Sequence, residues 1–218
     1  MFKSEEELVN SFNKMYIKFL MEIFDYKEES FLLNEYNSNN GIVDIVVGTF
    51  SKYKSLNKRQ PINVNLISPL INFEMDCVIE LEYFMNYYNI SKQYARKCLN
   101  EYSDAGFFSK IDKNKYMKIN NYEININNVV SIEAKLKNWS KALLQAYRYK
   151  RFSNMSFVLL DEQYSKPALK SITLFKNYNI GLITMTKQNY NIHFIPQENK
   201  PKDIINFMKL NEETVSYL

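Results

Sequence analysis

The sequence predicts an α/β fold in which a mixed sheet is flanked by helices on both faces. In the second half of the chain, runs of β-forming residues alternate with segments of helical period, and this β-α-β-α-β order favours parallel strands covered by helices. Near the start, an amphipathic helix precedes two β-type runs. Between these parts the pattern changes to short helices and a second hairpin. We therefore predict a core built from residues 1–50 and 126–218, with a subdomain inserted at 51–125.

The amino-acid composition limits the classes of protein to which the chain can belong. The 218 residues are 46% hydrophobic with only four glycines, which favours regular structure around a sizeable core. Cys77 and Cys98 are too few for a disulfide framework and lack metal-ligand spacing, so we expect both to be reduced and partly buried, and we expect no zinc site. No apolar run is long enough for a membrane span and no leader pattern is present, so we expect a cytoplasmic protein. The single histidine, His193, argues against a Ser-His-Asp triad and is expected at the surface of a strand.

The N-terminal region predicts a helix followed by a β-hairpin. Apolar residues at three- and four-residue spacing predict a helix over 5–27, with Ser4 as its N-cap and Glu7 three residues later. Residues 31–36 and 42–48 are expected to pair as strands around an Asn- and Gly-rich turn. Asp44 interrupts the second, apolar strand. Either a hydrogen bond at a solvated face or a metal ion would explain an acid at that position.

The inserted region begins with a polar, basic stretch, 51–65, which we expect to be a linker or surface loop. A first helix is marked by Val78, Leu81, Phe84 and Met85, and a second is expected over 92–105, ending at Gly106. On the second helix the expected inward side chains are Tyr94, Cys98, Leu99 and Tyr102, and the expected outward ones are Gln93, Arg96, Lys97 and Asn100. A hairpin over 107–111 and 116–119 follows.

Residues 89–108, ending in Ala105-Gly106-Phe107-Phe108, resemble the recognition helix and wing junction of a winged helix-turn-helix. The resemblance implies that Gln93, Arg96, Lys97 and Asn100 enter a DNA major groove, with Lys113 and Lys115 near phosphates. Winged helices also serve as protein-contact modules or spacers, and that alternative stays open.

The most informative stretch is 128–136, where a Glu-x-Lys lies inside a run of β-formers. Alternation along a strand puts Glu133 and Lys135 on one side and Ile132, Ala134 and Leu136 on the other. Such a pair can hold a divalent cation and stabilise charge on a phosphate if a second carboxylate converges on it. Two further acid-x-Lys triplets, at 25–27 and 198–200, fall at a helix end and in a polar loop, so strand context distinguishes only Glu133-Ala134-Lys135.

The chain after this strand predicts the rest of the sheet and its cover. A helix over 139–152 has Asn138 as its N-cap, places Gln145 and Tyr149 on one face, and is expected to make apolar contacts through Leu143, Leu144, Ala146 and Tyr147. Further elements are expected in the order strand 156–160, helix 167–178, strand 180–185, edge strand 190–195 and helix 201–211.

Charge is unevenly distributed along a chain whose net charge is +4. No acid occurs between Asp44 and Glu74, or between Glu133 and Asp161, while both stretches are rich in lysine and arginine. Such local surpluses suit a polyanion such as nucleic acid, although a basic face can also be a simple solvated face.

Together these features resemble the PD-(D/E)XK nuclease superfamily, with the winged helix inserted between the two halves of its site. Asp44 matches the first acid, Glu133 the second and Lys135 the lysine. Gln145 and Tyr149 resemble the Gln-x-x-x-Tyr element of some exonuclease branches, and residues 179–183 resemble a strand common in this restriction-endonuclease-like fold. Val43, where the family often has proline, is a departure that leaves the chemistry intact.

The resemblance implies metal-dependent hydrolysis of phosphodiester bonds, most simply in DNA. Asp44, Glu133 and the carbonyl of Ala134 would hold Mg²⁺ or Mn²⁺, Lys135 would orient or deprotonate water or neutralise charge, and Gln145 would position water or a phosphate oxygen. Glu35 is either a further ligand or a surface acid, and Tyr149 is a possible accessory. Double-strand cleavage by one such site would imply a homodimer. The alternatives are a DNA-binding regulator or assembly protein with an inactive core, and an enzyme that acts on RNA.

Overall fold

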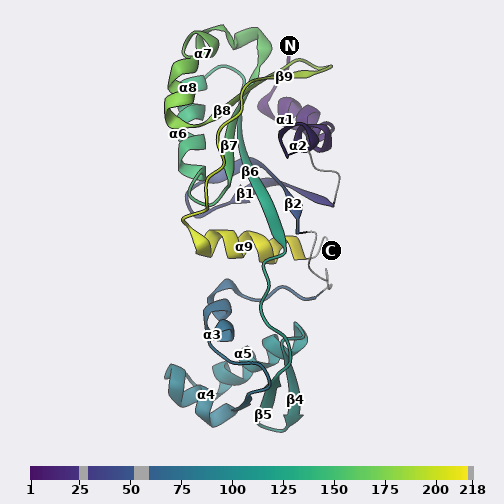
Figure 1. The fold of residues 1–218 in the computed structure, drawn as a ribbon, viewed down its shortest axis with the longest axis vertical. Coiled ribbons are helices and arrows are strands. Elements are labelled where there is room, and N and C mark those ends of the chain that lie inside the picture. The colour runs from purple at the N-terminus through teal and green to yellow at the C-terminus, as the bar shows by residue number, and fades with distance from the viewer. Residues whose placement is uncertain (25–28, 52–58, 216–218) are drawn as a thin grey trace. The chain divides into compact units, whose positions relative to one another are not determined.

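The computed structural model describes residues 1–24, 29–51 and 59–215. The chain forms two compact units (Figure 1): unit 1 comprises Met1–Tyr53 and Ile126–Phe207, and unit 2 comprises Lys54–Asn125 and Met208–Leu218. The triplet at 25–27 and residues 52–58 of the polar stretch expected as a linker, 51–65, lie outside the described residues.

Unit 1 is built on a six-stranded mixed sheet in the order β1-β2-β6-β7-β8-β9. The pairs β6–β7 and β7–β8 are parallel and the others are antiparallel. The strands are β1 (Ser30–Asn37), β2 (Ile42–Phe50), β6 (Ile126–Lys135), β7 (Met155–Asp161), β8 (Gly181–Met185) and β9 (Tyr190–Phe194). The predicted α/β class, the first hairpin and the edge strand near residues 190–195 are confirmed.

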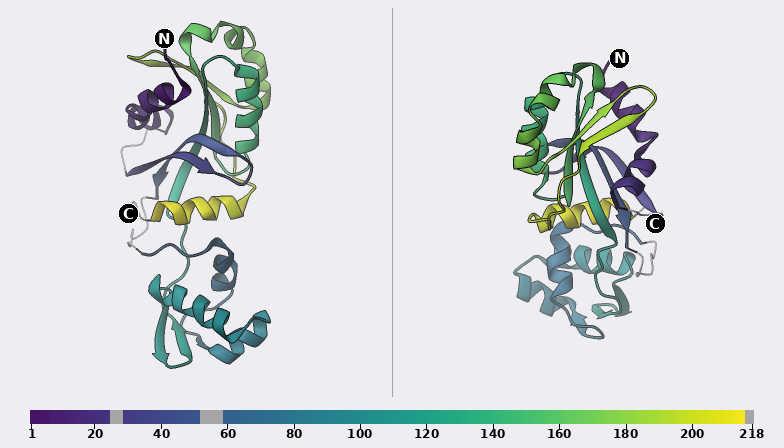
Figure 2. Two further views of the ribbon diagram at one scale, coloured as in Figure 1. Left: turned by 180° about the vertical axis from the view of Figure 1, so that it is seen from behind. Right: turned by 45° about the horizontal axis from the view of Figure 1, so that its top comes forward.

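Helices cover both faces of this sheet, as Figures 1 and 2 show. On one face lie α1 (Glu5–Asn13) and α2 (Tyr16–Phe24), and on the other α6 (Trp139–Tyr149), α7 (Lys166–Lys170) and α8 (Ile172–Tyr178). A short 3-10 turn, η2 (Glu162–Tyr164), precedes α7.

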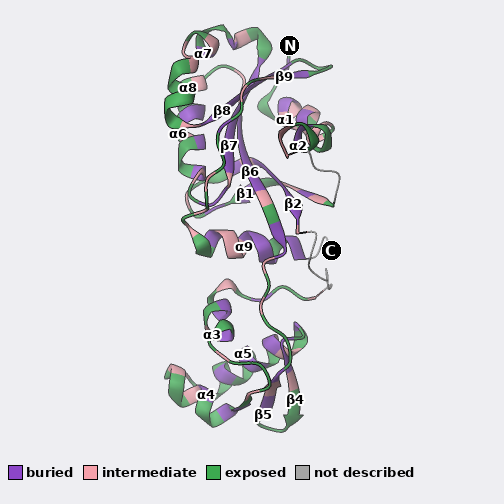
Figure 3. Ribbon diagram, viewed as in Figure 1, coloured by how far each residue is buried: buried purple, intermediate pink, exposed green. Residues whose placement is uncertain are grey.

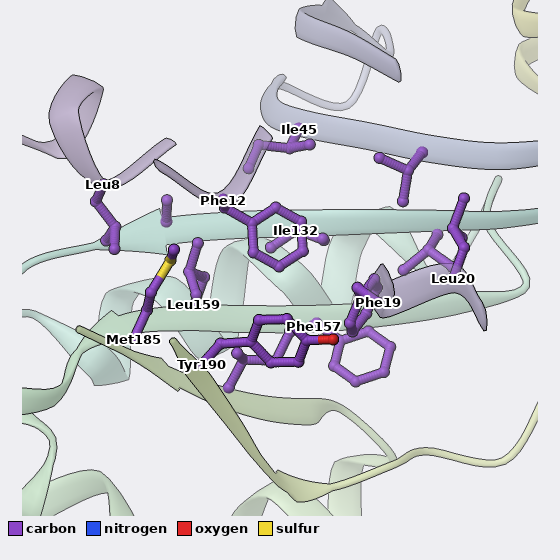
Figure 4. Packing of buried hydrophobic residues seen from close by; sticks show 14 of the residues in the cluster. Leu8, Phe12, Phe19, Leu20, Ile45, Ile132, Phe157, Leu159, Met185 and Tyr190 are labelled. Carbon is purple, nitrogen blue, oxygen red and sulfur yellow. The ribbon is translucent and has the colours of Figure 1, made fainter. Parts of the chain in front are cut away.

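The core beneath α1 and α2 is rich in aromatic rings (Figure 4). Phe19 packs edge to face on Phe12 at 5.2 Å and on Phe157 of β7 at 5.3 Å between ring centroids. Ile45 of β2 and Ile132 of β6 are fully buried in the same cluster. This packing fixes which side of each strand faces the helices, and therefore which side carries the polar residues of β2 and β6.

The single helix predicted over 5–27 is wrong, because the chain bends between α1 and α2. The N–H of Met15 bonds to the carbonyl of Phe12, three residues back, which tightens the turn and redirects the chain so that Phe12 and Phe19 both reach the sheet. The predicted N-cap is confirmed, since the hydroxyl of Ser4 accepts the N–H of Glu7 at 3.1 Å.

On the opposite face, α6 packs through Ala142, Leu143 and Ala146 against Val158 and other apolar residues of β7 and β8. Asn138 caps α6 as predicted. Leu144 and Tyr147 were expected in the apolar contact but are 63% and 51% exposed, because the buried stripe follows positions 142, 143, 146 and 149.

One smaller correction and one confirmed expectation concern the same side of the sheet. The helix predicted over 167–178 is interrupted at Ser171, whose N–H bonds back to the carbonyls of Pro167 and Ala168, and it forms α7 and α8. His193 is exposed, as expected, and its Nε2 lies 2.8 Å from the hydroxyl of Thr184.

Unit 2 combines short helices with a three-stranded antiparallel sheet in the order β3-β5-β4. Its elements are η1 (Val64–Leu66), α3 (Ile67–Ile71), β3 (Val78–Glu80), α4 (Leu81–Tyr88), α5 (Lys92–Asp104), β4 (Phe108–Asp112) and β5 (Lys115–Lys118). The second helix and second hairpin are confirmed. Val78 was expected in a helix, but it pairs with Met117 of β5, and α4 begins only at Leu81.

The core of unit 2 corrects one further expectation. The buried stripe of α5 is Ala95, Cys98, Leu99 and Tyr102, whereas Tyr94 is 48% exposed because it lies one position before the stripe. Cys77 and Cys98 are both free, one half-buried and one buried, as predicted.

The C-terminal helix, α9 (Ile204–Thr214), starts three residues later than expected. Near its end, Glu212 forms a two-pronged ion pair with Arg59, at 2.6 and 2.7 Å, and the guanidinium lies 4.9 Å from the ring centroid of Phe107. These contacts fasten the last turns of α9 to the rest of unit 2. Over the part of the chain that the structure describes, no helix combines the length and the apolar content needed to cross a membrane.

Candidate active site

The two acids expected to converge lie on neighbouring strands of unit 1. Ile45 of β2 pairs with Ile132 of β6, so the next step of this antiparallel register sets Asp44 opposite Glu133. Because Ile45 and Ile132 point toward α1 and α2, the two acids point to the other face of the sheet. The carboxylate of Asp44 is held by the backbone N–H of Ala134, which donates to its Oδ2 at 2.8 Å.

The ammonium of Lys135 lies at the centre of this group. Its Nζ is 2.9 Å from Glu133 Oε1, 2.8 Å from the carbonyl oxygen of Ala134 and 3.5 Å from Asp44 Oδ2. The Glu133 side chain is 1% exposed and that of Lys135 14%. A positive charge therefore already lies among the oxygens that the family resemblance implies as metal ligands.

A third acid, Glu5, reaches the same lysine and was not anticipated. Its Oε2 lies 3.2 Å from Lys135 Nζ. Glu5 is the first residue of α1, held there by the Ser4 N-cap, and α1 packs against β6. Acids in the first turn of α1 are visible in the sequence, but they are equally expected from favourable interaction with the helix dipole. Only the packing of α1 on the sheet singles out Glu5.

The charges of this cluster shift the pKa values of its members. Burial and the nearby charge of Asp44 raise the pKa of Glu133, despite its hydrogen bonds to Lys135 and Tyr149. Burial by itself would lower the pKa of Lys135, but the hydrogen bond to Glu133 and the charges of Glu133, Asp44 and Glu5 raise it overall. Three carboxylates surround a single ammonium, so the cluster carries a net negative charge. The cluster therefore favours the uptake of further positive charge.

The inner face of α6 supports Glu133 from the side. The Tyr149 hydroxyl lies 3.1 Å from Glu133 Oε2 and 2.8 Å from the carbonyl oxygen of Ile42 at the start of β2. Burial and the charge of Glu133 raise the pKa of Tyr149, while a hydrogen bond from the Gln145 side chain acts in the opposite direction. Gln145 Oε1 is buried without a hydrogen-bond partner in the described structure. The structure thus places Gln145 and Tyr149 on one face of α6, as their spacing predicted, and brings Tyr149 to Glu133.

Glu35 does not join the cluster. It interrupts the pairing of β1 with β2 at a left-handed φ of 52°, and its side chain is exposed. No hydrogen bond or ion pair within the described residues links it to Asp44 or Glu133.

The donor set fits a hard divalent cation. No group of three or more His, Cys, Asp or Glu side chains among the described residues is arranged to hold a metal. The donors are instead two carboxylates, Asp44 and Glu133, and the carbonyl of Ala134, and oxygen donors of this kind suit Mg²⁺ or Mn²⁺. The Lys135 ammonium already lies within 3.5 Å of all three. A metal ion bound to these oxygens would have to take the place of the Lys135 ammonium.

In unit 2, the four α5 residues expected at DNA lie on one exposed face. Gln93, Arg96, Lys97 and Asn100 line a hollow of about 600 Å³, together with Gln60, Pro61, Glu101 and Asp104. Two acids therefore share this surface with the basic residues.

Lys113 and Lys115 lie at the β4–β5 turn and line a second hollow, of about 340 Å³. Lys115 pairs with Glu80 at 2.9 Å, and Arg96 donates to Asn114 Oδ1 at 3.3 Å. The last contact ties the exposed face of α5 to the tip of the hairpin.

No protein-family model, no curated protein and no solved structure matches this chain.

Proposed function

We propose that the protein is a metal-dependent nuclease that hydrolyses phosphodiester bonds in DNA. The observation that carries the proposal is the convergence of Asp44, Glu133 and the Ala134 carbonyl around the ammonium of Lys135. This is the constellation that the resemblance to PD-(D/E)XK nucleases implies. It forms from two strands, β2 and β6, that are far apart in the sequence.

Each residue has a role that follows from its contacts. Asp44, Glu133 and the Ala134 carbonyl would hold Mg²⁺ or Mn²⁺, which would supply Lewis-acid chemistry at the phosphate and at a bound water. A lysine keeps its proton at neutral pH, so Lys135 would neutralise negative charge developing on the phosphate. Glu5 retains the ammonium near the site. Tyr149 fixes the orientation of Glu133, and Gln145 presents its unpaired carbonyl oxygen to water.

We further propose that unit 2 is a winged helix that binds duplex DNA. Gln93, Arg96, Lys97 and Asn100 would read the major groove, and Lys113 and Lys115 would contact phosphates. The exposed α5 face and its bond from Arg96 to the hairpin tip support this assignment.

One observation favours a second candidate. Lys135 already occupies the position between the acids, as it would in a core that never binds metal. The protein would then be a DNA-binding regulator or assembly protein that uses the winged helix alone.

Cleavage of supercoiled plasmid, linear duplex, single-stranded DNA and RNA in Mg²⁺ or Mn²⁺ tests the proposal. Wild type should cut at least one substrate, and Asp44→Ala and Lys135→Ala should not. Glu6→Gln, which removes an exposed acid next to Glu5, is the matched control. If wild type cuts nothing but shifts duplex DNA in a gel, and Arg96→Ala combined with Lys97→Ala abolishes the shift, the second candidate holds.

A further inference from the structure

The outer face of α6 and α8 exposes large apolar side chains. Leu144 and Tyr147 on α6 are 63% and 51% exposed, and Leu174 and Tyr178 on α8 are 43% and 45% exposed. Figure 3 shows the outward sides of both helices as exposed. Residues three or four apart are neighbours on a helix surface, so each helix contributes one adjacent pair. We name these four residues the α6/α8 patch.

The aromatic part of the patch is held in a fixed arrangement. The rings of Tyr147 and Tyr178 meet edge to face, with centroids 5.5 Å apart and planes at 70°. Lys150 Nζ lies 5.6 Å from the centroid of the Tyr147 ring and donates to the carbonyl oxygen of Tyr178 at 2.7 Å. The two helices therefore present ring surfaces and a cation together.

The surroundings of the patch are strongly basic. The sequence has no Asp or Glu at 134–160 or 163–197, and these stretches contain α6, α7 and α8. Arg148, Arg151 and Lys176 are exposed, and none of them forms an ion pair within the described residues. Burial and the charge of Lys202 lower the pKa of Lys150, consistent with a local surplus of positive charge.

The exposed rings and cations indicate which class of molecule the α6/α8 patch binds. A second copy presenting the same face would bring like charges together, which opposes a symmetric dimer at the patch. Exposed aromatic rings beside unpaired cations are the combination that binds single-stranded nucleic acid, with bases stacked on the rings and phosphates at the cations.

We propose that the α6/α8 patch binds single-stranded nucleic acid, with bases stacking on Tyr147 and Tyr178 and phosphates contacting Arg148, Arg151 and Lys176. The proposal rests on the proposed nuclease function, because α6 carries Gln145 and Tyr149 of the candidate site on its inner face. A nucleic-acid single strand bound on the outer face of α6 would be the part of the substrate that continues past the cleaved bond.

Fluorescence anisotropy with labelled dT12 in EDTA tests the patch without any need for cleavage. Tyr147→Ala should weaken dT12 binding at least about fivefold, while Tyr147→Phe, which keeps the ring, should bind as wild type does. Arg148→Gln combined with Lys176→Gln should reduce the slope of log K against log salt by about 1.4, at about 0.7 per phosphate contact. Tyr83→Ala is the matched control, since Tyr83 is 54% exposed and stacks on Tyr87 of α4 in unit 2.

The possible results separate this proposal from the others. Equal dT12 affinity of wild type and Tyr147→Ala would overturn it, as would an equal loss with Tyr83→Ala. So would sedimentation showing a wild-type dimer that Tyr147→Ala converts to monomer, because a second copy would then occupy the patch. Absence of cleavage in Mg²⁺ would refute the nuclease proposal. The dT12 affinities, which are measured in EDTA, would still decide whether the α6/α8 patch binds single-stranded nucleic acid.

Discussion

Replacing Lys135 by alanine should separate metal binding from catalysis. Lys135 Nζ lies 2.8 to 3.5 Å from the oxygens that would hold the metal. Two unit positive charges about 4 Å apart repel by about 4 kcal/mol at an effective dielectric constant of about 20, and a divalent ion doubles this repulsion. The two cations cannot occupy the cluster together. Metal binding must therefore displace the ammonium and break at least one of its hydrogen bonds.

The size of the effect follows from that lost contact. A hydrogen bond to a charged group contributes about 1.5 to 3 kcal/mol, and every 1.4 kcal/mol is a tenfold change in affinity. Lys135→Ala removes the competitor, so it should bind Mn²⁺ about 10- to 100-fold more tightly than wild type while losing cleavage activity. Free Mn²⁺ measured by electron paramagnetic resonance gives both affinities, with Lys14→Ala, an exposed lysine of unit 1, as control. Unchanged or weaker binding by Lys135→Ala would refute the idea that lysine and metal compete for one position.

Three further predictions concern stability. Mg²⁺ at about 100 times its dissociation constant should raise the free energy of unfolding by about 2.7 kcal/mol, or the Tm of unit 1 by about 5 to 11 °C, and calorimetry should find no such rise for Asp44→Asn. In EDTA, the raised pKa of Glu133 means that Glu133 binds its proton more tightly in the folded state. The resulting contribution to the free energy of unfolding is fully present below the unfolded-state pKa and is lost as pH rises through the folded-state pKa. Wild type should therefore lose stability relative to Glu133→Gln as pH rises above about 4.5, and urea titrations that give parallel pH profiles would contradict this. Gly181→Ala should destabilise unit 1 by about 1 to 3 kcal/mol, because the new Cβ would lie 2.0 Å from Phe157 Cδ1, and a wild-type urea midpoint would show that the Phe157 ring gives way.

Much of the candidate site follows from strand alternation. The β-forming run around Glu133 predicts that Glu133 and Lys135 share a face, and the apolar hairpin strand marks Asp44 as anomalous. Helical spacing then places Gln145 with Tyr149. Their meeting depends on the pairing of β2 with β6, which is a long-range register that local patterns do not encode.

The remaining features depend on tertiary packing. Glu5 could not be chosen from its neighbours Glu6 and Glu7, because only the position of α1 over β6 brings it to Lys135. No proline or glycine near Met15 predicts the bend from the sequence. The bend forms because Phe12 and Phe19 both pack on the sheet. Leu144 and Tyr147 are apolar residues at helical spacing, yet they lie outside the buried stripe of α6. Apolar periodicity predicted that helix correctly but did not decide which of its apolar residues the sheet would cover.

The most direct test of the central claim is the single-turnover rate of DNA cleavage in Mg²⁺ by wild type and Glu133→Gln. The substitution keeps the volume of a side chain that is 1% exposed, removes its charge and replaces one carboxylate oxygen by an amide NH2. We predict cleavage by wild type and a rate at least about 100-fold lower for Glu133→Gln, as for the loss of one interaction with the reacting charge. Equal rates for the two proteins would contradict the assignment of this cluster as the catalytic centre.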